Sequence, residues 1–210
     1  MKKKSTLLSL ILVFSMVVSA MGCGNKNTSV SESSTSAKSE SVPSKSSSDS
    51  AKDEQVKFTD STGREVEIPK NIDRIAPSGP LAQVVLYTLC PDKLVGLAAE
   101  MKDSQTEFID EKYRSLPVFG NFYGDTLNME AIMSAKPQVV IDIGEMKPTA
   151  KEDMKGVQDK TGIPSIFIHM ELDSMAEAYR TLGKIVGEED QAEKIASYVE
   201  KTLSEAKEKS

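Results

Sequence analysis

Residue types that commonly build catalytic or metal sites are scarce in this 210-residue chain: it has one histidine, two cysteines and no tryptophan. Two isolated cysteines cannot form a four-ligand zinc module or the several cross-links of a disulfide-stabilised miniprotein. Basic residues are also in deficit, with 26 Lys and Arg against 32 Asp and Glu and a net charge of −6. A chain without a basic excess lacks the electrostatic footprint of a general nucleic-acid binder, so we expect no nucleic-acid partner.

The single long apolar run lies at the N-terminus and has the layout of an export signal. Lys2–Lys4 are followed by an apolar stretch from Leu7 to Val18 and then by small residues up to Gly22. A run of this length is too short for a stable membrane-spanning helix, which needs about 20 residues. We therefore predict that residues 1–22 are a signal peptide.

Cys23 follows this segment directly. The sequence Ala20-Met21-Gly22-Cys23 resembles a bacterial lipobox, although Ala20 stands where leucine is usual. In a lipobox the cysteine is diacylated and becomes the new N-terminus, and two acyl chains such as palmitate anchor a protein far better than one. The resemblance implies a lipoprotein held at Cys23 on the extracytoplasmic face of the cell membrane. An ordinary secretory signal followed by an incidental cysteine is the alternative.

Residues 23–55 lack the apolar content of a folded segment. Twelve serines lie within residues 28–50, which contain one proline and no aromatic residue. Such a composition buries too little apolar surface to offset the backbone entropy lost on folding. We predict a disordered tether that holds the following domain away from the membrane.

Residues 56–187 alternate between strand-like and helix-like stretches. Residues 56–60 and 65–69 alternate in polarity around a Ser-Thr-Gly-Arg turn, which predicts a β-hairpin. The pattern predicts further strands at 74–77, 94–98, 117–120, 138–143 and 165–169, and helices at 80–90, 108–113, 128–135 and 149–161. Strands separated by helices of this length indicate βαβ units, so we predict an α/β fold, a Rossmann-like lobe with a parallel sheet. Within it, Cys90 is expected to be a buried small hydrophobe.

Two helices without a further strand end the sequence. Ser174 and Glu177 have the spacing of a capping box, and the helix that they begin runs to about Val186. We predict that residues 188–210 form the start of a long second helix, whose acidic first residues would complement the helix dipole. This helix has an apolar stripe that no later segment of the sequence covers: Ala192, Ile195, Ala196, Val199 and Leu203.

The order of several short motifs resembles one protein family. The motifs are Asp60-x-x-Gly63-Arg64, Pro69 with Arg74-Ile75, Leu94-Val95-Gly96-Leu97, Asn128-Met129-Glu130-Ala131-Ile132, Lys136-Pro137-Gln138-Val139-Val140 and Thr161-Gly162-Ile163-Pro164. Each is weak alone, but together, behind a lipobox, they resemble the solute-binding proteins of ABC importers for iron-siderophores, haem and cobalamin. This is the helical-backbone group, or class III, of periplasmic-binding-protein-like proteins, and the likeness covers residues 56–209.

Members of that family have two α/β lobes joined by one long helix, with the ligand held between the lobes. The resemblance implies that residues 56–187 are the N-terminal lobe and that the C-terminal lobe is absent, either because the sequence is a fragment or because a second chain supplies it. The implied partners are an ABC permease and an iron-siderophore, haem or cobalamin-type ligand. In the family an acidic residue at the position of Glu130 docks on the permease; stabilisation of a helix end by any carboxylate is the alternative.

Ligands of parallel α/β sheets bind beyond the carboxyl ends of the strands. The residues at these ends are the candidates for a ligand cleft: Ser78, Gly79, Pro80, Glu100, Met101, Phe122, Tyr123, Glu145, Met146, His169 and Met170. The aromatic pair either contacts a ligand or packs on the sheet. His169 is the only histidine and suits haem or iron, but a lone histidine is more often structural, and methionine more often fills an apolar gap.

The sequence has no catalytic signature beside these candidates. It lacks the GxSxG elbow, the phosphate-binding GxxxxGK[ST] loop and the HExxH zinc motif. We expect a binding protein rather than an enzyme, with no resident cofactor and no metal site of its own. An enzyme built on a Rossmann-like lobe and a non-functional truncated product are the alternatives.

Overall fold

The computed structural model describes residues 54–105, 107–124 and 126–209. The predicted signal peptide, Cys23 and nearly all of the predicted tether lie outside the described residues. The described residues all belong to one compact unit, Ser48–Ser210.

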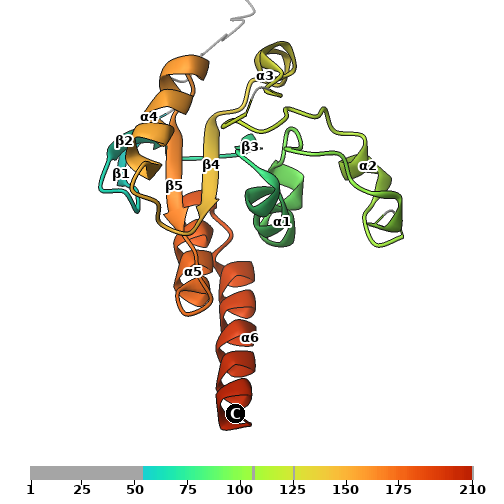
Figure 1. Cartoon of the computed structure of the whole chain (residues 1–210), viewed down its shortest axis with the longest axis vertical. Helices are drawn as coiled ribbons and strands as arrows, with labels where there is room; N and C mark the ends of the chain where they lie inside the picture. The colour runs from blue at the N-terminus through green and yellow to red at the C-terminus, as the bar shows by residue number, and fades with distance from the viewer. Residues whose placement is uncertain (1–53, 106, 125, 210) are drawn as a thin grey trace, which may run out of the picture. The chain divides into compact units, whose positions relative to one another are not determined.

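A three-stranded parallel sheet forms the centre of the fold (Figure 1). Its strands are β3 (Ile75–Pro77), β4 (Val139–Gly144) and β5 (Ser165–His169), in the order β3-β4-β5. Helix α1 (Pro80–Leu89) follows β3, and α4 (Ala150–Thr161) connects β4 to β5. The parallel pairing confirms the predicted α/β architecture.

Helix α3 (Met129–Ala135) precedes β4 and begins where the sequence predicts. The Asn128 side chain accepts a hydrogen bond from the Ala131 backbone N–H at 3.0 Å, which caps the helix. Lys136 then adopts a left-handed conformation (φ 48°) that ends it.

The predicted hairpin is confirmed as β1 (Gln55–Thr59) paired antiparallel with β2 (Glu65–Pro69). Its turn contacts β5, because the Ser61 N–H donates to the Phe167 carbonyl at 2.9 Å. Asp60, which is only 3% exposed, lies in this turn, and its carboxylate accepts hydrogen bonds from the backbone N–H groups of Thr62 and Arg64. The turn thus joins the hairpin to the edge of the parallel sheet.

The strands predicted at 94–98 and 117–120 are wrong in extent, since each forms only single bridges. Leu94 pairs with Ile75 of β3, whereas Leu97 pairs with Val118. The segment therefore changes partner within three residues, and neither ladder can grow. Farther on, the Gln83 side chain of α1 accepts the backbone N–H groups of Ala98 and Ala99, which are then unavailable to a strand partner.

The connection that follows contains less helix than predicted. The helix expected at 108–113 is a single turn, α2 (Glu111–Arg114), capped by the Asp110 side chain. The 3₁₀ turn η2 (Asp103–Gln105) also lies in this connection, whereas a second 3₁₀ turn, η1 (Pro91–Lys93), directly follows α1.

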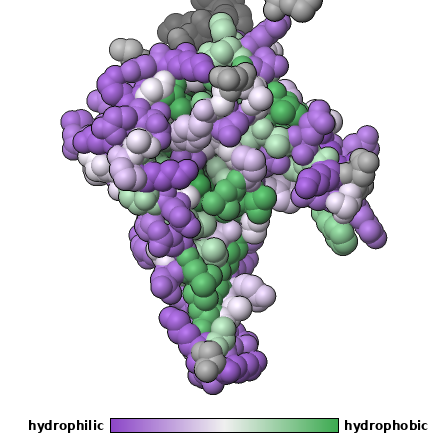
Figure 2. All heavy atoms as spheres, in the orientation of Figure 1, coloured by the Kyte–Doolittle hydropathy of each residue, from purple (hydrophilic) through white to green (hydrophobic). Residues whose placement is uncertain are grey.

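Helices α5 (Met175–Val186) and α6 (Glu189–Glu208) pack against each other as a pair. Arg180 of α5 forms ion pairs with Glu193 at 2.8 Å and Glu200 at 2.6 Å, both on α6. Figure 2 shows a hydrophobic strip along this pair. The preceding helix α5 packs on part of the predicted α6 stripe, where Ala192 and Ala196 are buried.

The capping box predicted at the start of α5 does not form in the described structure. Ser174 makes no side-chain cap hydrogen bond to the helix. Its hydroxyl oxygen instead accepts the Glu171 backbone N–H at 2.9 Å, so it stabilises the turn that precedes the helix.

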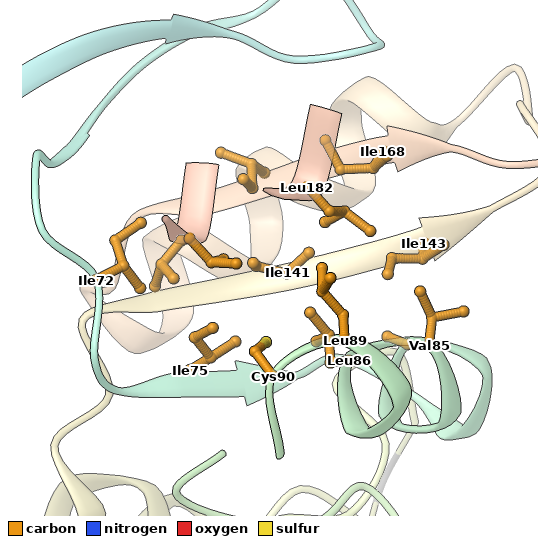
Figure 3. Packing of buried hydrophobic residues seen from close by; sticks show 14 of the residues in the cluster. Ile72, Ile75, Val85, Leu86, Leu89, Cys90, Ile141, Ile143, Ile168 and Leu182 are labelled. Carbon is orange, nitrogen blue, oxygen red and sulfur yellow. The ribbon is translucent and has the colours of Figure 1, made fainter. Parts of the chain in front are cut away.

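Alternate residues of the central strands face opposite sides of the sheet, and each side has its own core. Ile141, Ile143 and Ile168 face α1 and α5, where they pack with Leu86 and Leu182 (Figure 3). The other face includes Val140, Phe167, Ile132, Met154 and Phe119, with contributions from α3 and α4. Helices therefore pack against both faces of the sheet, each through its own hydrophobic core.

Cys90 is buried as predicted, with 3% of its surface exposed, and it forms no disulfide with any described residue. Burial raises the pKa of its thiol to about 12, so the thiol stays protonated at neutral pH. None of the helices in the described ranges combines the length and the apolar character that crossing a membrane requires.

Candidate ligand-binding site

A cavity of about 680 Å³ opens beyond the carboxyl ends of β3 and β4. The first turns of α1 and α4 border it, because right-handed βαβ connections begin their helices at this edge of the sheet. Its lining comprises Gly79, Pro80, Leu81, Ala82, Asn121, Tyr123, Asp142, Ile143, Gly144, Glu145, Lys147, Thr149, Ala150, Asp153 and Phe167. The volume is in the range of small-molecule sites, and the position is where such sheets bind ligands.

Asp142 of β4 lines this cavity, and its carboxylate accepts hydrogen bonds from two other segments of the chain. One carboxylate oxygen accepts a hydrogen bond from the Ser78 hydroxyl, and the other accepts one from the Tyr123 hydroxyl. Ser78 is fully buried, and its backbone N–H donates to the Ile141 carbonyl at 3.1 Å. The carboxylate is therefore held from two sides by hydroxyl groups from different segments.

The loop that follows Gly120 holds Tyr123 over the cavity. Phe122 is 4% exposed and anchors the loop in the core, and its N–H donates to the Ser78 carbonyl at 3.1 Å. The Asn121 side-chain oxygen accepts the Tyr123 N–H at 3.0 Å, which fixes the next residue. Phe122 therefore packs in the core, whereas Tyr123 lines the cavity.

The Tyr123 hydroxyl is held in its protonated form. Burial raises the pKa of Tyr123 far above its ordinary value, and the nearby charge of Asp142, its hydrogen bond to Asp142 and the charge of Asp153 raise it further. The phenol is thus a neutral group whose single proton points at Asp142.

The remaining polar lining is mainly acidic. Glu145 and Asp153 add two carboxylates, and Lys147 is the one cationic side chain among the described residues of the lining. The Thr149 hydroxyl donates to Asp153 at 2.8 Å. No cluster of three or more potential metal-binding side chains occurs among the residues that the structure describes.

The structure brings four of the predicted cleft residues to this cavity: Gly79, Pro80, Tyr123 and Glu145. Ser78 lies behind it, bound to Asp142. Phe122 and Met170 pack in the two cores, which agrees with the packing alternative for each. Outside the described cavity lining lie Glu100, Met101, Met146 and His169.

His169 ends β5 with a half-buried side chain. Its Nε2 lies 3.9 Å from a Glu171 carboxylate oxygen, and its buried Nδ1 has no hydrogen-bond partner among the described residues. Neither His169 nor Glu171 belongs to the described lining of the cavity.

Sequence reasoning missed Asp142, Lys147 and Asp153. The signal for Asp142 was a lone carboxylate within the apolar strand Val139–Gly144, since a charge in a buried strand needs partners. Lys147 and Asp153 carried no such signal, because charged residues around a helix start are ordinary.

Glu130 lies apart from the lining of the cavity, exposed in the first turn of α3. With Asn128, Ala131 and Ser134 it lines a shallow hollow of about 290 Å³. Its position is compatible with contact to a macromolecule and equally with stabilisation of the helix end.

The structure has a parallel α/β layer, a cavity at the strand ends and a long helix that follows. This geometry agrees with the family that the sequence matches. The chain belongs to the periplasmic binding protein family, whose model matches residues 91–210. The resemblance derived from the short motifs is thereby confirmed at the level of the family.

Several solved structures share the fold. An ABC transporter solute-binding protein from Sulfurospirillum deleyianum DSM 6946 is 24% identical, with a TM-score of 0.62 over 71% of this chain and 47% of that one. A periplasmic solute-binding protein from Veillonella parvula DSM 2008 is 27% identical, with a TM-score of 0.59 over 74% and 48%.

The molybdate-bound periplasmic binding protein MolA of Haemophilus influenzae is 17% identical, with a TM-score of 0.55 over 67% of this chain and 49% of that one. No curated protein matches the chain. The chain thus spans about half the length of the solved proteins that it matches.

Proposed function

We propose that this chain is the extracytoplasmic solute-binding component of an ABC importer for an iron chelate, haem or a corrinoid. The observation that carries the proposal is the cavity at the carboxyl ends of β3 and β4 in a member of the periplasmic binding protein family. The cavity forms one wall of the ligand cleft, and the protein binds and hands over its ligand without covalent chemistry.

The proposal includes a plan for the whole chain. Residues 1–22 direct export, Cys23 carries the lipid anchor, and residues 23–55 are the tether. Residues 56–187 form the N-terminal lobe, and 188–210 begin the helix that connects to a second lobe. In support, α6 continues for 20 residues after the last element of the sheet layer, with Tyr198 71% exposed on its surface.

Calorimetric titration of the chain with haem, a cobalamin and a ferric hydroxamate tests the binding function. At least one of these should bind, and Tyr123→Phe should weaken that ligand's affinity by about fivefold, because the variant loses one hydroxyl at the cavity wall. Tyr198→Phe is the matched control, since it removes an exposed hydroxyl from α6, outside the cavity. Absence of binding by all three ligands would contradict the proposed function.

Glu130 is proposed to dock on basic residues of the permease. Glu130→Lys should lower ATP-dependent uptake by about tenfold or more while leaving the affinity for ligand unchanged, because charge reversal across a docking surface costs several kcal/mol. The measurement pairs uptake by membranes that contain the permease with calorimetry on the isolated chain.

The control for Glu130 must also reverse a charge at a helix start. Glu177 is exposed in the first turn of α5, so Glu177→Lys removes a comparable favourable interaction with the helix dipole. Equal uptake by the Glu130→Lys and Glu177→Lys variants would assign Glu130 to helix stabilisation alone.

A further inference from the structure

The hydroxyl groups around the cavity all direct their protons at carboxylates. Tyr123 and Ser78 donate to the two oxygens of Asp142, and Thr149 donates to Asp153 at 2.8 Å. A hydroxyl has one proton, so Tyr123 and Thr149 present only oxygen lone pairs to the cavity. The hydroxyl groups of the wall therefore offer acceptors and no free donor, and the side-chain donors left in the lining are the Lys147 ammonium and the Asn121 amide.

We infer that Asp142, by accepting the hydrogen bond of the Tyr123 hydroxyl, makes the cavity selective for ligands that bring hydrogen-bond donors or positive charge. Ligands with net negative charge are bound weakly. The inference rests on the proposed function and narrows its ligand class. It favours a cationic or neutral ferric hydroxamate or a corrinoid with amide side chains over an anionic catecholate chelate.

The net charge of the lining also favours cationic ligands and disfavours anionic ones. Asp142, Glu145 and Asp153 face a single described cation, Lys147. Burial of an anionic ligand against this wall brings like charges together at reduced dielectric, where repulsion is stronger than in water.

One feature of the cavity opposes this selectivity, namely the N-terminus of α1. Gly79 caps it without a side-chain hydrogen bond, and its first turn has no acidic residue. A helix N-terminus is equivalent to about half of one positive charge, which is smaller than the full charge of any one lining carboxylate. At α4 the acidic first-turn residues Glu152 and Asp153 already offset the same effect. The acidic wall therefore dominates.

The test compares two ferric chelates of similar size and opposite charge by calorimetry on the full chain. The probes are a singly cationic ferric trihydroxamate and a trianionic ferric tris-catecholate. The wild-type chain should bind the cationic probe at least about tenfold more tightly than the anionic one. Added salt should weaken binding of the cationic probe, because its attraction to exposed carboxylates is screened.

Asp142→Asn should reduce the ratio of the two affinities by about fivefold, since it removes one charge and leaves an acceptor for only one of the two hydroxyl groups, Ser78 or Tyr123. Asp159→Asn, on the exposed end of α4 and outside the lining, should leave the ratio unchanged. If the Asp142 variant does not fold, Glu145→Gln at the exposed rim should shift the ratio in the same direction.

The possible failures are distinguishable. If neither probe binds and haem and cobalamin also fail to bind, the proposed function is overturned together with this inference. If the wild-type chain binds the anionic probe as tightly as the cationic one, or if neither the Asp142 nor the Glu145 variant changes the ratio, the selectivity is overturned and the binding function stands.

Discussion

Replacing Asp60 by asparagine is expected to lower the free energy of unfolding by about 3 kcal/mol. Asp60 is 3% exposed and its partner Arg64 has 12% of its side chain exposed, so the pair is shielded from solvent. Their charged groups lie 3.5 Å apart. Removing one charge leaves the Arg64 guanidinium buried without its counter-charge, which costs more than the loss of an exposed pair.

The geometry of the turn makes asparagine a poor substitute. One Asp60 oxygen accepts the Thr62 N–H at 2.9 Å and the Arg64 N–H at 3.1 Å, while the other faces the Phe167 N–H and the Arg64 guanidinium. An asparagine amide has one oxygen and one NH₂ group, so one side of the turn must meet donors with donors. Both the hairpin and its attachment to β5 are weakened.

Chemical denaturation and thermal unfolding measure this effect. For a domain of this size a loss of about 3 kcal/mol corresponds to a fall of about 10 °C in Tm. Asp159→Asn breaks the ion pair between Lys155 and Asp159, whose side chains are 69% and 62% exposed, and should cost less than about 1 kcal/mol. A similarly small loss for Asp60→Asn would show that the buried pair does not stabilise the fold.

For the hairpin that contains Asp60, the sequence predicts the local structure but not its contact with the sheet. The motif Asp60-x-x-Gly63-Arg64 was recognised, and alternating polarity predicted the flanking strands, because strand period and turn residues are local properties. The contact of the turn with Phe167 joins residues far apart in the chain. No periodicity encodes such a contact, so the hairpin was predicted and its attachment to the sheet was not.

The same distinction applies to the cavity. Gly79, Pro80, Tyr123 and Glu145 were found because they follow predicted strands, and the rule that ligands bind beyond strand ends is topological. Asp142 lies within a strand, and its importance depends on two hydroxyl groups delivered by other segments. The strand predicted at 94–98 failed for a related reason, since a ladder depends on its partners and this segment changes partner.

Replacing Gly120 by alanine is expected to lower the free energy of unfolding by about 3 kcal/mol and to weaken ligand binding by tenfold or more. Gly120 has φ +79°, a left-handed conformation that costs alanine about 1–2 kcal/mol. A Cβ atom built there would lie 2.0 Å from the Thr126 carbonyl oxygen, and backbone cannot yield as a side-chain tip can. The resulting overpacking adds about 1–3 kcal/mol.

The expected loss of binding follows from the position of Gly120 in the chain. It begins the loop in which Asn121 and Phe122 fix the Tyr123 hydroxyl over Asp142. A shift of the Gly120 backbone moves the aromatic side chain that borders the cavity, and misplacement of about 1 Å is enough to lose a hydrogen bond. The measurements are denaturant unfolding and calorimetry with whichever ligand the wild-type chain binds.

Gly124→Ala in the same loop is the matched control. A Cβ atom there would meet its nearest neighbours, Asn121 and Thr126, at 3.8–3.9 Å, which is ordinary contact, and the residue has no positive φ. The same substitution should therefore be neutral or stabilise by about 0.4–1 kcal/mol through the unfolded state. If both variants kept wild-type stability and affinity, the conformation of Gly120 would not be what positions Tyr123. If Gly120→Ala alone lost both, the cavity would depend on this one backbone geometry.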